Sequence, residues 1–128
     1  MHRLAQLRLD TQDRVAVATV DGEIDLSNAT GLEMAISESV PNQALGLVVD
    51  VAGVRYLDSS GVGLLFNLAR RVSRRQQEFA VVAPSDAAVR EILALSGAEH
   101  ALSLHDSLTD AVSQLEGDRR SSDPNQAG

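Results

Sequence analysis

The sequence predicts a single α/β domain, in which helices flank a mixed, mostly parallel central sheet of four to five strands. Short apolar runs alternate along the chain with helical patterns, and strands joined by helices of about ten or more residues pair in parallel. The first two strands are instead joined by a short polar turn, so they are expected to pair antiparallel and make the sheet mixed. A length of 128 residues fits one domain.

The N-terminal part predicts two neighbouring strands. Residues 14–20 (RVAVATV) are dominated by β-branched and small apolar side chains, which favour a strand. Residues 4–9 alternate more weakly and are expected to form an antiparallel edge strand, with the turn over the polar residues 10–13. After Gly22, residues 23–25 predict a further short extended piece.

The first helix and the strand that follows it are predicted from periodicity. Residues 27–40 show helical spacing, with Asp25 or Ser27 as the N-cap and Pro41 as the stop. Residues 44–51 (ALGLVVDV) are apolar on both faces, which is typical of a strand covered on both sides of its sheet. We therefore expect that strand near the centre.

A heavily buried helix is predicted over residues 60–75. Its expected buried face comprises Val62, Leu65, Phe66, Ala69 and Val72, widened by Leu64 and Leu68. Residues 79–83 predict the next strand. The following helix is expected to start at Ser85 as N-cap and to end at Gly97.

The C-terminal part predicts a marginal strand over residues 101–104 and a last helix over residues 106–116. Residues 1–116 therefore make up the predicted domain. Residues 117–128 contain no large apolar side chain, so we expect them to form a disordered polar tail.

Composition excludes several kinds of chemistry. All 11 basic residues are arginine, and cysteine is absent, so there is no thiol nucleophile, thiolate metal site, Schiff-base lysine or P-loop lysine. The net charge of −7 argues against direct nucleic-acid binding, because phosphate contacts need a positive surface. A protein partner is therefore expected, with no metal and no cofactor.

The sequence also predicts no membrane association. It has no run of about 18 consecutive apolar residues, and its start lacks the apolar region of a signal peptide. The absence of cysteine fits the reducing interior of a cell. We therefore expect a soluble cytoplasmic protein.

The most informative segment is residues 56–63 (YLDSSGVG), between the central strand and the most buried helix. The carboxyl ends of strands are where open α/β sheets meet ligands and partners. Asp58, Ser59 and Ser60 are all N-cap residue types, so helix capping alone is one explanation. The other is a switch, because phosphorylation of an exposed serine here would add about −1.5 to −2 charges at a helix N-terminus and change partner binding.

Four motifs occur together in a fixed order: GEID at 22–25, VDV at 49–51, YLDSSGVG at 56–63 and LALSG at 93–97. On these motifs the sequence resembles the STAS domain, and more closely the single-domain bacterial anti-sigma factor antagonists. The resemblance implies a non-enzymatic partner switch that is commonly monomeric. Its unphosphorylated form binds an anti-sigma factor, usually a serine kinase, and thereby frees a sigma factor.

The resemblance also implies which residues act. The kinase would phosphorylate the serine directly after the aspartate, here Ser59, and a serine phosphatase would restore the free form. The partner-binding positions that the resemblance implies are Asp25, Asp58, Ser59, Ser60, Gly61 and Gly63.

Other functions are also considered. A STAS module that senses a nucleotide or small ligand, or scaffolds a stress-signalling complex, would use Ser59 only as a cap. Asp50 suggests a receiver domain, but a receiver needs a lysine, so Asp50 is expected to receive loop N–H groups. A small hydrolase built on His100 and His105 is the least favoured, because no geometry links a nucleophile, a base and an orienting group.

A basic cluster stands out in this acidic sequence, formed by Arg70, Arg71, Arg74 and Arg75. The favoured interpretation is an exposed, solvated face near a helix C-terminus, where cations are favourable. Contact with an acidic partner surface is the alternative.

Overall fold

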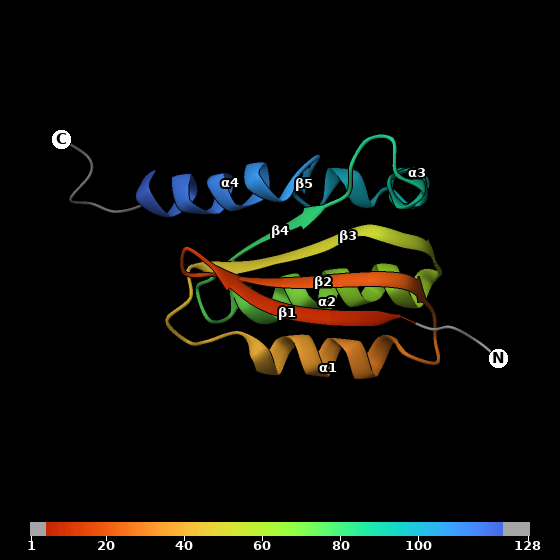
Figure 1. Ribbon diagram of the computed structural model, residues 1–128, viewed down its shortest axis with the longest axis horizontal. Helices are drawn as coiled ribbons and strands as arrows, with labels where there is room; N and C mark the ends of the chain where they lie inside the picture. The colour runs from red at the N-terminus through yellow and green to blue at the C-terminus, as the bar shows by residue number, and fades with distance from the viewer. Residues whose placement is uncertain (1–4, 122–128) are drawn as a thin grey trace.

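The structure is a computed structural model that describes the backbone of residues 5–121 and the side chains of residues 5–117. The elements in chain order are β1 (Gln6–Gln12), β2 (Val15–Ile24), α1 (Ala29–Ser39), β3 (Gly46–Leu57), α2 (Ser59–Ser73), β4 (Glu78–Val82), α3 (Ala88–Leu95), the 3-10 turn η1 (Ala98–His100), β5 (Leu104–His105) and α4 (Leu108–Ser121). One sheet contains all five strands in the order β1-β2-β3-β4-β5 (Figure 1). Only β1 is antiparallel to its neighbour, so the predicted mixed, mostly parallel sheet with a central third strand is confirmed.

The helices form two unequal layers, because α1, α2 and α3 contribute to one hydrophobic core and α4 to another. Because the strand order advances in one direction, right-handed crossovers place α1, α2 and α3 on the same face of the sheet. On that face Leu47 and Val49 of β3 lie in one core with Leu64 and Leu68 of α2. On the other face Val48 lies in a smaller core under α4. Both cores consist of buried Leu, Val, Ile and Ala side chains, apart from partly buried Phe66 and Phe79 at the edge of the larger one.

The N-terminal hairpin is tighter than predicted. β1 continues through Gln12, and the turn consists of Asp13 and Arg14, both with positive φ (52° and 69°) as in a two-residue hairpin turn. The prediction of a turn over residues 10–13 was wrong because this edge strand is exposed and needs no apolar alternation there. Its exposed Arg8 and Asp10 form an ion pair (3.6 Å), and charged side chains on an edge strand disfavour pairing with another chain.

β2 is also longer than predicted. It continues through Gly22, whose φ is 104°, and ends at Ile24. The extended piece predicted over residues 23–25 is therefore the end of this strand rather than a separate strand. A glycine at positive φ lets the strand pass through a conformation that other residues adopt at a cost.

β3 extends well beyond the predicted residues 44–51 and ends at Leu57. Its register against β2 shifts at two places, as in β-bulges, so β3 holds extra residues. The exposed residues that result come in two consecutive pairs, Ala52 with Gly53 and Arg55 with Tyr56. These pairs break the period of two that predicts a strand. Asp50 accepts a hydrogen bond from the Ala52 N–H (3.0 Å), which confirms its expected structural role.

The starts of α1 and α3 differ from prediction. The residue before α1 is Asn28, so neither Asp25 nor Ser27 is its N-cap. α3 starts at Ala88, because Ser85 bonds to Asp106 instead of capping the helix. Gly97 follows α3 with φ 79°, which confirms the predicted glycine at the end of this helix.

The buried arc of α2 is rotated from the predicted one. Its fully buried residues are Gly61, Leu64, Leu65, Leu68 and Val72. Val62, Phe66 and Ala69 are only half-buried, because the arc is centred on the residues that face the sheet. The prediction that α2 is the most buried helix depends on this arc.

The C-terminal elements are shifted towards the end of the chain. β5 spans Leu104–His105 instead of residues 101–104, and α4 continues to Ser121, beyond the predicted end at residue 116. The rest of the predicted tail, residues 122–128, lies outside the described residues. No helix in the described part of the chain combines the length and apolar character needed to cross a membrane.

Candidate functional site

The site forms where the carboxyl ends of β2 and β3 meet. Ile24 lies opposite Leu57 in the parallel register, and both side chains are buried. The N–H of Asp58 donates to the carbonyl of Ile24 (3.2 Å), so the turn after β2 and the start of α2 are tied together. This contact brings the Asp25 and Asp58 segments, 33 positions apart in the chain, to one rim of the sheet.

Asp58 is the N-cap of α2. Its Oδ1 accepts hydrogen bonds from the N–H groups of Ser60 (2.8 Å) and Gly61 (3.3 Å), two of the donors that a helix start leaves unsatisfied. Ser59 is the first residue of the helix and is exposed. The interpretation of Ser59 as only a cap is therefore contradicted, because the cap is its neighbour.

Asp25 organises the turn after β2. Its Oδ1 accepts from the N–H (2.9 Å) and the hydroxyl (2.5 Å) of Ser27, while its own N–H donates to Oδ1 of Asn28 (3.0 Å). Asn28 also donates through Nδ2 to the carbonyl of Glu23 (2.9 Å). These bonds hold the turn in one conformation beside Ser59.

The two glycines predicted as partner-binding residues have different surroundings. Gly61 is buried, and a Cβ added there would lie 2.7 Å from Cβ of Leu57. Gly61 is therefore needed for the close approach of α2 to the end of β3. Around Gly63 nothing lies within 4 Å of an added Cβ, so the fold does not require a glycine there.

The rim is acidic, with Glu23, Asp25 and Asp58 on adjoining segments. Because the N–H groups of Ser60 and Gly61 already donate to Asp58, an anion on Ser59 would find fewer free donors than an uncapped helix start offers. The helix dipole still favours negative charge at this position, while the Asp58 carboxylate opposes it.

Comparison with known protein families identifies the fold. The model of the STAS domain matches residues 6–111, most of the chain. The chain belongs to the STAS domain family. This confirms the resemblance that the four sequence motifs carry.

This STAS domain has named relatives in sequence and in structure. The anti-sigma-F factor antagonist RsfB of Mycobacterium tuberculosis is 35% identical over 105 residues, which cover 82% of this chain and 84% of the relative. A crystal structure of an anti-sigma factor antagonist from Mycobacterium paratuberculosis matches with a TM-score of 0.74 and 31% identity, over 88% of this chain and 94% of that one. The Bacillus cell fate determinant SpoIIAA in its phosphorylated form shares the fold, with a TM-score of 0.62 and 19% identity over 86% of this chain and 99% of that one.

A second polar cluster of this STAS domain lies at the carboxyl ends of β4 and β5. Pro84, Ser85, Asp86 and Asp106 line an open depression of about 430 Å³. Hydrogen bonds from the Ser85 hydroxyl and N–H to Asp106 hold the pKa of that carboxyl below its usual range, with a smaller contribution from the charge of Arg90. The carboxylate thus already has donors, and the cluster joins the β4–α3 loop to the segment after β5.

The histidines in the described part of the chain contact neighbouring polar side chains and belong to no group that could hold a metal ion. His105 bonds to the Ser103 hydroxyl (2.9 Å), and exposed His100 lies 3.9 Å from Glu99. Within the described residues, no group of three His, Asp or Glu side chains is placed to hold a metal ion.

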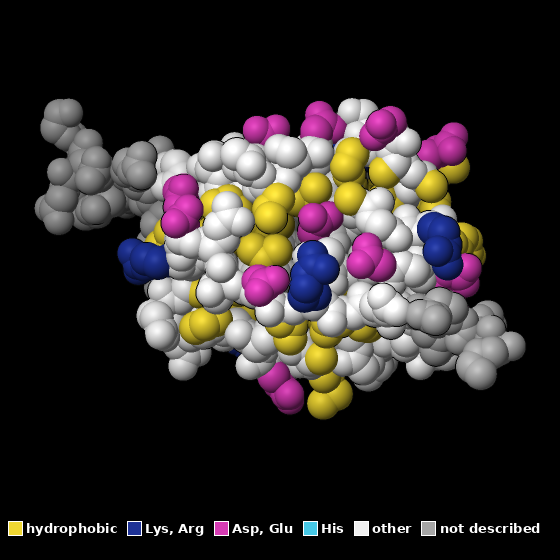
Figure 2. Space-filling view, viewed as in Figure 1, with side chains coloured by type: hydrophobic (Ala, Val, Ile, Leu, Met, Phe, Trp, Pro, Cys, Tyr) yellow, Lys and Arg dark blue, Asp and Glu magenta, His cyan; other side chains and the backbone are white. Residues whose placement is uncertain are grey.

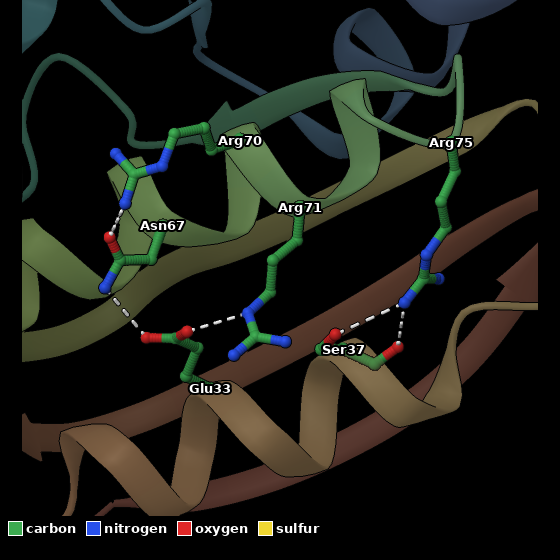
Figure 3. Close-up of polar contacts among 6 residues, drawn as sticks. All are labelled: Glu33, Ser37, Asn67, Arg70, Arg71 and Arg75. Carbon is green, nitrogen blue, oxygen red and sulfur yellow. Dashed lines mark hydrogen bonds and ion pairs between the residues drawn. The ribbon is translucent and has the colours of Figure 1, made fainter.

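Two residues of the arginine cluster, Arg71 and Arg75, hold α1 against α2 (Figure 3). Arg71 forms an ion pair with Glu33 (2.8 Å), and Asn67 donates to the same carboxylate (3.0 Å). Arg75 donates to the carbonyl and hydroxyl of buried Ser37 (both 3.3 Å) and thus caps the end of α1. All four arginines are exposed near the end of α2, which confirms the predicted solvated face, and two of them also hold α1 in place.

Two exposed apolar side chains, Leu26 and Tyr56, lie at the rim but were not among the residues predicted for the site. Leu26 lies in the turn between Asp25 and Ser27, and Tyr56 lies two residues before Asp58. The sequence signal for Leu26 is that it is an apolar residue in a polar turn, before the predicted helix and outside the spacing of that helix's apolar residues. For Tyr56 the signal is the disrupted alternation at the end of β3.

Proposed function

We propose that this protein is an anti-sigma factor antagonist controlled by reversible phosphorylation of Ser59. Its unphosphorylated form binds an anti-sigma factor that is also a serine kinase, which releases a sigma factor. One observation carries the switch: Asp58 caps α2, so exposed Ser59 has a hydroxyl that the helix start does not use. The names of RsfB and of the Mycobacterium paratuberculosis protein support the same role.

The expected effect of the phosphate is on binding more than on folding. The dipole of α2 offsets part of the added charge, so the helix tolerates it. Because Asp58 takes the N–H groups of Ser60 and Gly61, the phosphate projects towards the partner instead of folding onto the helix end. About −1.5 to −2 charges are then added to a rim that is already acidic.

The protein acts in this scheme as a substrate and a ligand, not as a catalyst. The kinase supplies the phosphoryl group from ATP, and a serine phosphatase removes it. We place the cycle in the cytoplasm, with a monomeric antagonist that docks through the rim formed by Asp25, Asp58, Ser59, Ser60 and Gly63. Gly61 contributes indirectly, by letting α2 approach the sheet.

Phosphorylation and binding assays test the proposal. Incubation with the anti-sigma factor and ATP, followed by intact mass and peptide mapping, is expected to place one phosphate on Ser59. A Ser60→Ala variant should still be phosphorylated, whereas Ser59→Ala should not. Calorimetry should show that Ser59→Ala binds like the wild type and that Ser59→Asp binds weakly, because of its added charge. If Ser59 stays unmodified and Ser59→Asp binds as tightly as the wild type, the proposed phosphorylation switch is wrong.

A further inference from the structure

We propose that Leu26 and Tyr56 are apolar anchors of the docking surface, and that the anti-sigma factor receives them in an apolar depression bordered by Arg or Lys side chains. The inference rests on the proposed function and deepens it by naming what the partner must present. Three observations support it: the exposure of the two side chains, the geometry of β3 and the charges around them.

The exposure of these side chains is unusual for the chain. Among the described residues, the exposed large hydrophobic side chains are Leu9, Leu26, Met34, Tyr56 and Leu95. Leu26 is 80% exposed and follows Ile24, whose carbonyl accepts from the Asp58 N–H, by two residues; Tyr56 is 51% exposed and lies three residues before Ser59. An isolated exposed apolar side chain needs no explanation, but two at the rim of one candidate site indicate contact with another molecule.

Local structure holds both side chains towards solvent. The register shift between Gly22 and Glu23 bulges β3, and Tyr56 then lies exposed opposite Glu23 while the next residue, Leu57, is buried. Leu26 lies within the turn that the Asp25 hydrogen bonds fix. Side chains on fixed backbone lose little freedom on binding, which favours them as anchors. Tyrosine is also enriched among residues that dominate binding energy.

The charges around the anchors define the partner. Glu23 lies opposite Tyr56, Asp25 precedes Leu26, and Asp58 is the N-cap of α2. Figure 2 shows acidic side chains over this side of the molecule, with apolar side chains and a few arginines between them, and exposed Arg55 directly precedes Tyr56. Such a surface is complementary to an apolar depression with a basic rim. A phosphate on Ser59 would add a bulky group at the exposed start of α2 and obstruct the close contact that the anchors need, which connects them to the switch.

Matched substitutions test the anchors. Leu26→Ser is compared with Leu95→Ser, because Leu95 is 84% exposed but belongs to α3. Tyr56→Ala is compared with Met34→Ala, because Met34 is also 51% exposed but belongs to α1. Calorimetric titration with the anti-sigma factor is expected to give a Kd about 10- to 100-fold weaker for each rim variant. Both controls should bind like the wild type.

Further measurements separate anchoring from folding and from charge. All four variants should unfold at about the wild-type temperature, because the substituted side chains are exposed. Tyr56→Phe should bind like the wild type, since it keeps the ring. The loss caused by Leu26→Ser should persist at high salt, whereas a loss due to charge would shrink.

The possible failures are distinguishable. If the wild type binds and both rim variants weaken binding no more than their controls, the anchor inference is overturned and the proposed function stands. If the wild type itself does not bind an anti-sigma factor, the proposed function is overturned and the inference falls with it.

Discussion

Gly61 and Gly63 lie on the same turn of α2, yet a methyl group added at each meets different surroundings. At Gly61 it would lie 2.7 Å from Cβ of Leu57 and 3.3 Å from Cγ2 of Ile24, so the helix or the strands must shift. At Gly63 it would meet open space. Glycine is therefore needed for packing at position 61. At position 63 its role in partner binding stays a prediction.

This difference predicts opposite effects of alanine. Gly61→Ala is expected to lower the free energy of unfolding by about 1–3 kcal/mol, the usual cost of overpacking. Gly63→Ala is expected to raise it by about 0.5–1 kcal/mol, because alanine favours the helix, and at the same time to weaken partner binding. Urea denaturation measures the free energy of unfolding of both variants. Calorimetric titration with the anti-sigma factor measures the binding of Gly63→Ala. Equal stabilities of the two variants would contradict the packing role of Gly61.

At the scale of elements, α1 and α2 are joined by charged and polar contacts on their exposed side (Figure 3). Arg75 reaches the last turn of α1, where its guanidinium donates to the carbonyls of Ser37 (3.3 Å) and Val40 (3.4 Å). Those carbonyls belong to the group that a helix end leaves unsatisfied. The neighbouring Arg74 is exposed and has no such contact among the described residues.

Arg75→Ala is therefore expected to destabilise the protein by about 1 kcal/mol, since charged hydrogen bonds to the end of α1 are lost. Arg74→Ala should change stability by less than about 0.5 kcal/mol, as is usual for an exposed side chain. Urea unfolding of both variants, followed by circular dichroism, makes the comparison. A loss of the same size in both would show that the charge of the cluster matters and the specific bonds of Arg75 do not.

At the scale of the whole molecule, the net charge of −7 and the acidic rim predict electrostatic steering of the partner. The association rate with the anti-sigma factor is expected to fall about tenfold between roughly 0.05 and 0.5 M salt, because ions screen the attraction. Stopped-flow measurements check this. Glu23→Gln should slow association more than Glu38→Gln on α1, since Glu23 lies at the rim. A rate independent of salt would contradict steering.

Much of the architecture was predictable because its signals are local. The mixed sheet, the central third strand and Gly97 at the end of α3 all follow from short-range patterns, and each is confirmed. The boundaries of β1 and β3 were not predictable in this way. β1 is an edge strand exposed on both faces, and β3 contains two register shifts. Neither strand therefore shows the regular alternation of apolar and polar residues on which strand prediction depends.

By itself, the sequence determined the fold class, the family motifs and the position of Ser59 between a strand and a helix, because these depend on residue order and local periodicity. Only the tertiary structure decided that Asp58 caps α2, that Gly61 packs against Leu57, and that Leu26 and Tyr56 are exposed at the same rim. For Ile24 and Leu26 the physical reason is that the parallel pairing of β2 with β3 brings segments far apart in the chain to one rim. For the cap the reason is local: Asp58, Ser59 and Ser60 are adjacent cap-type residues, and only the backbone geometry decides which of them accepts from the helix start.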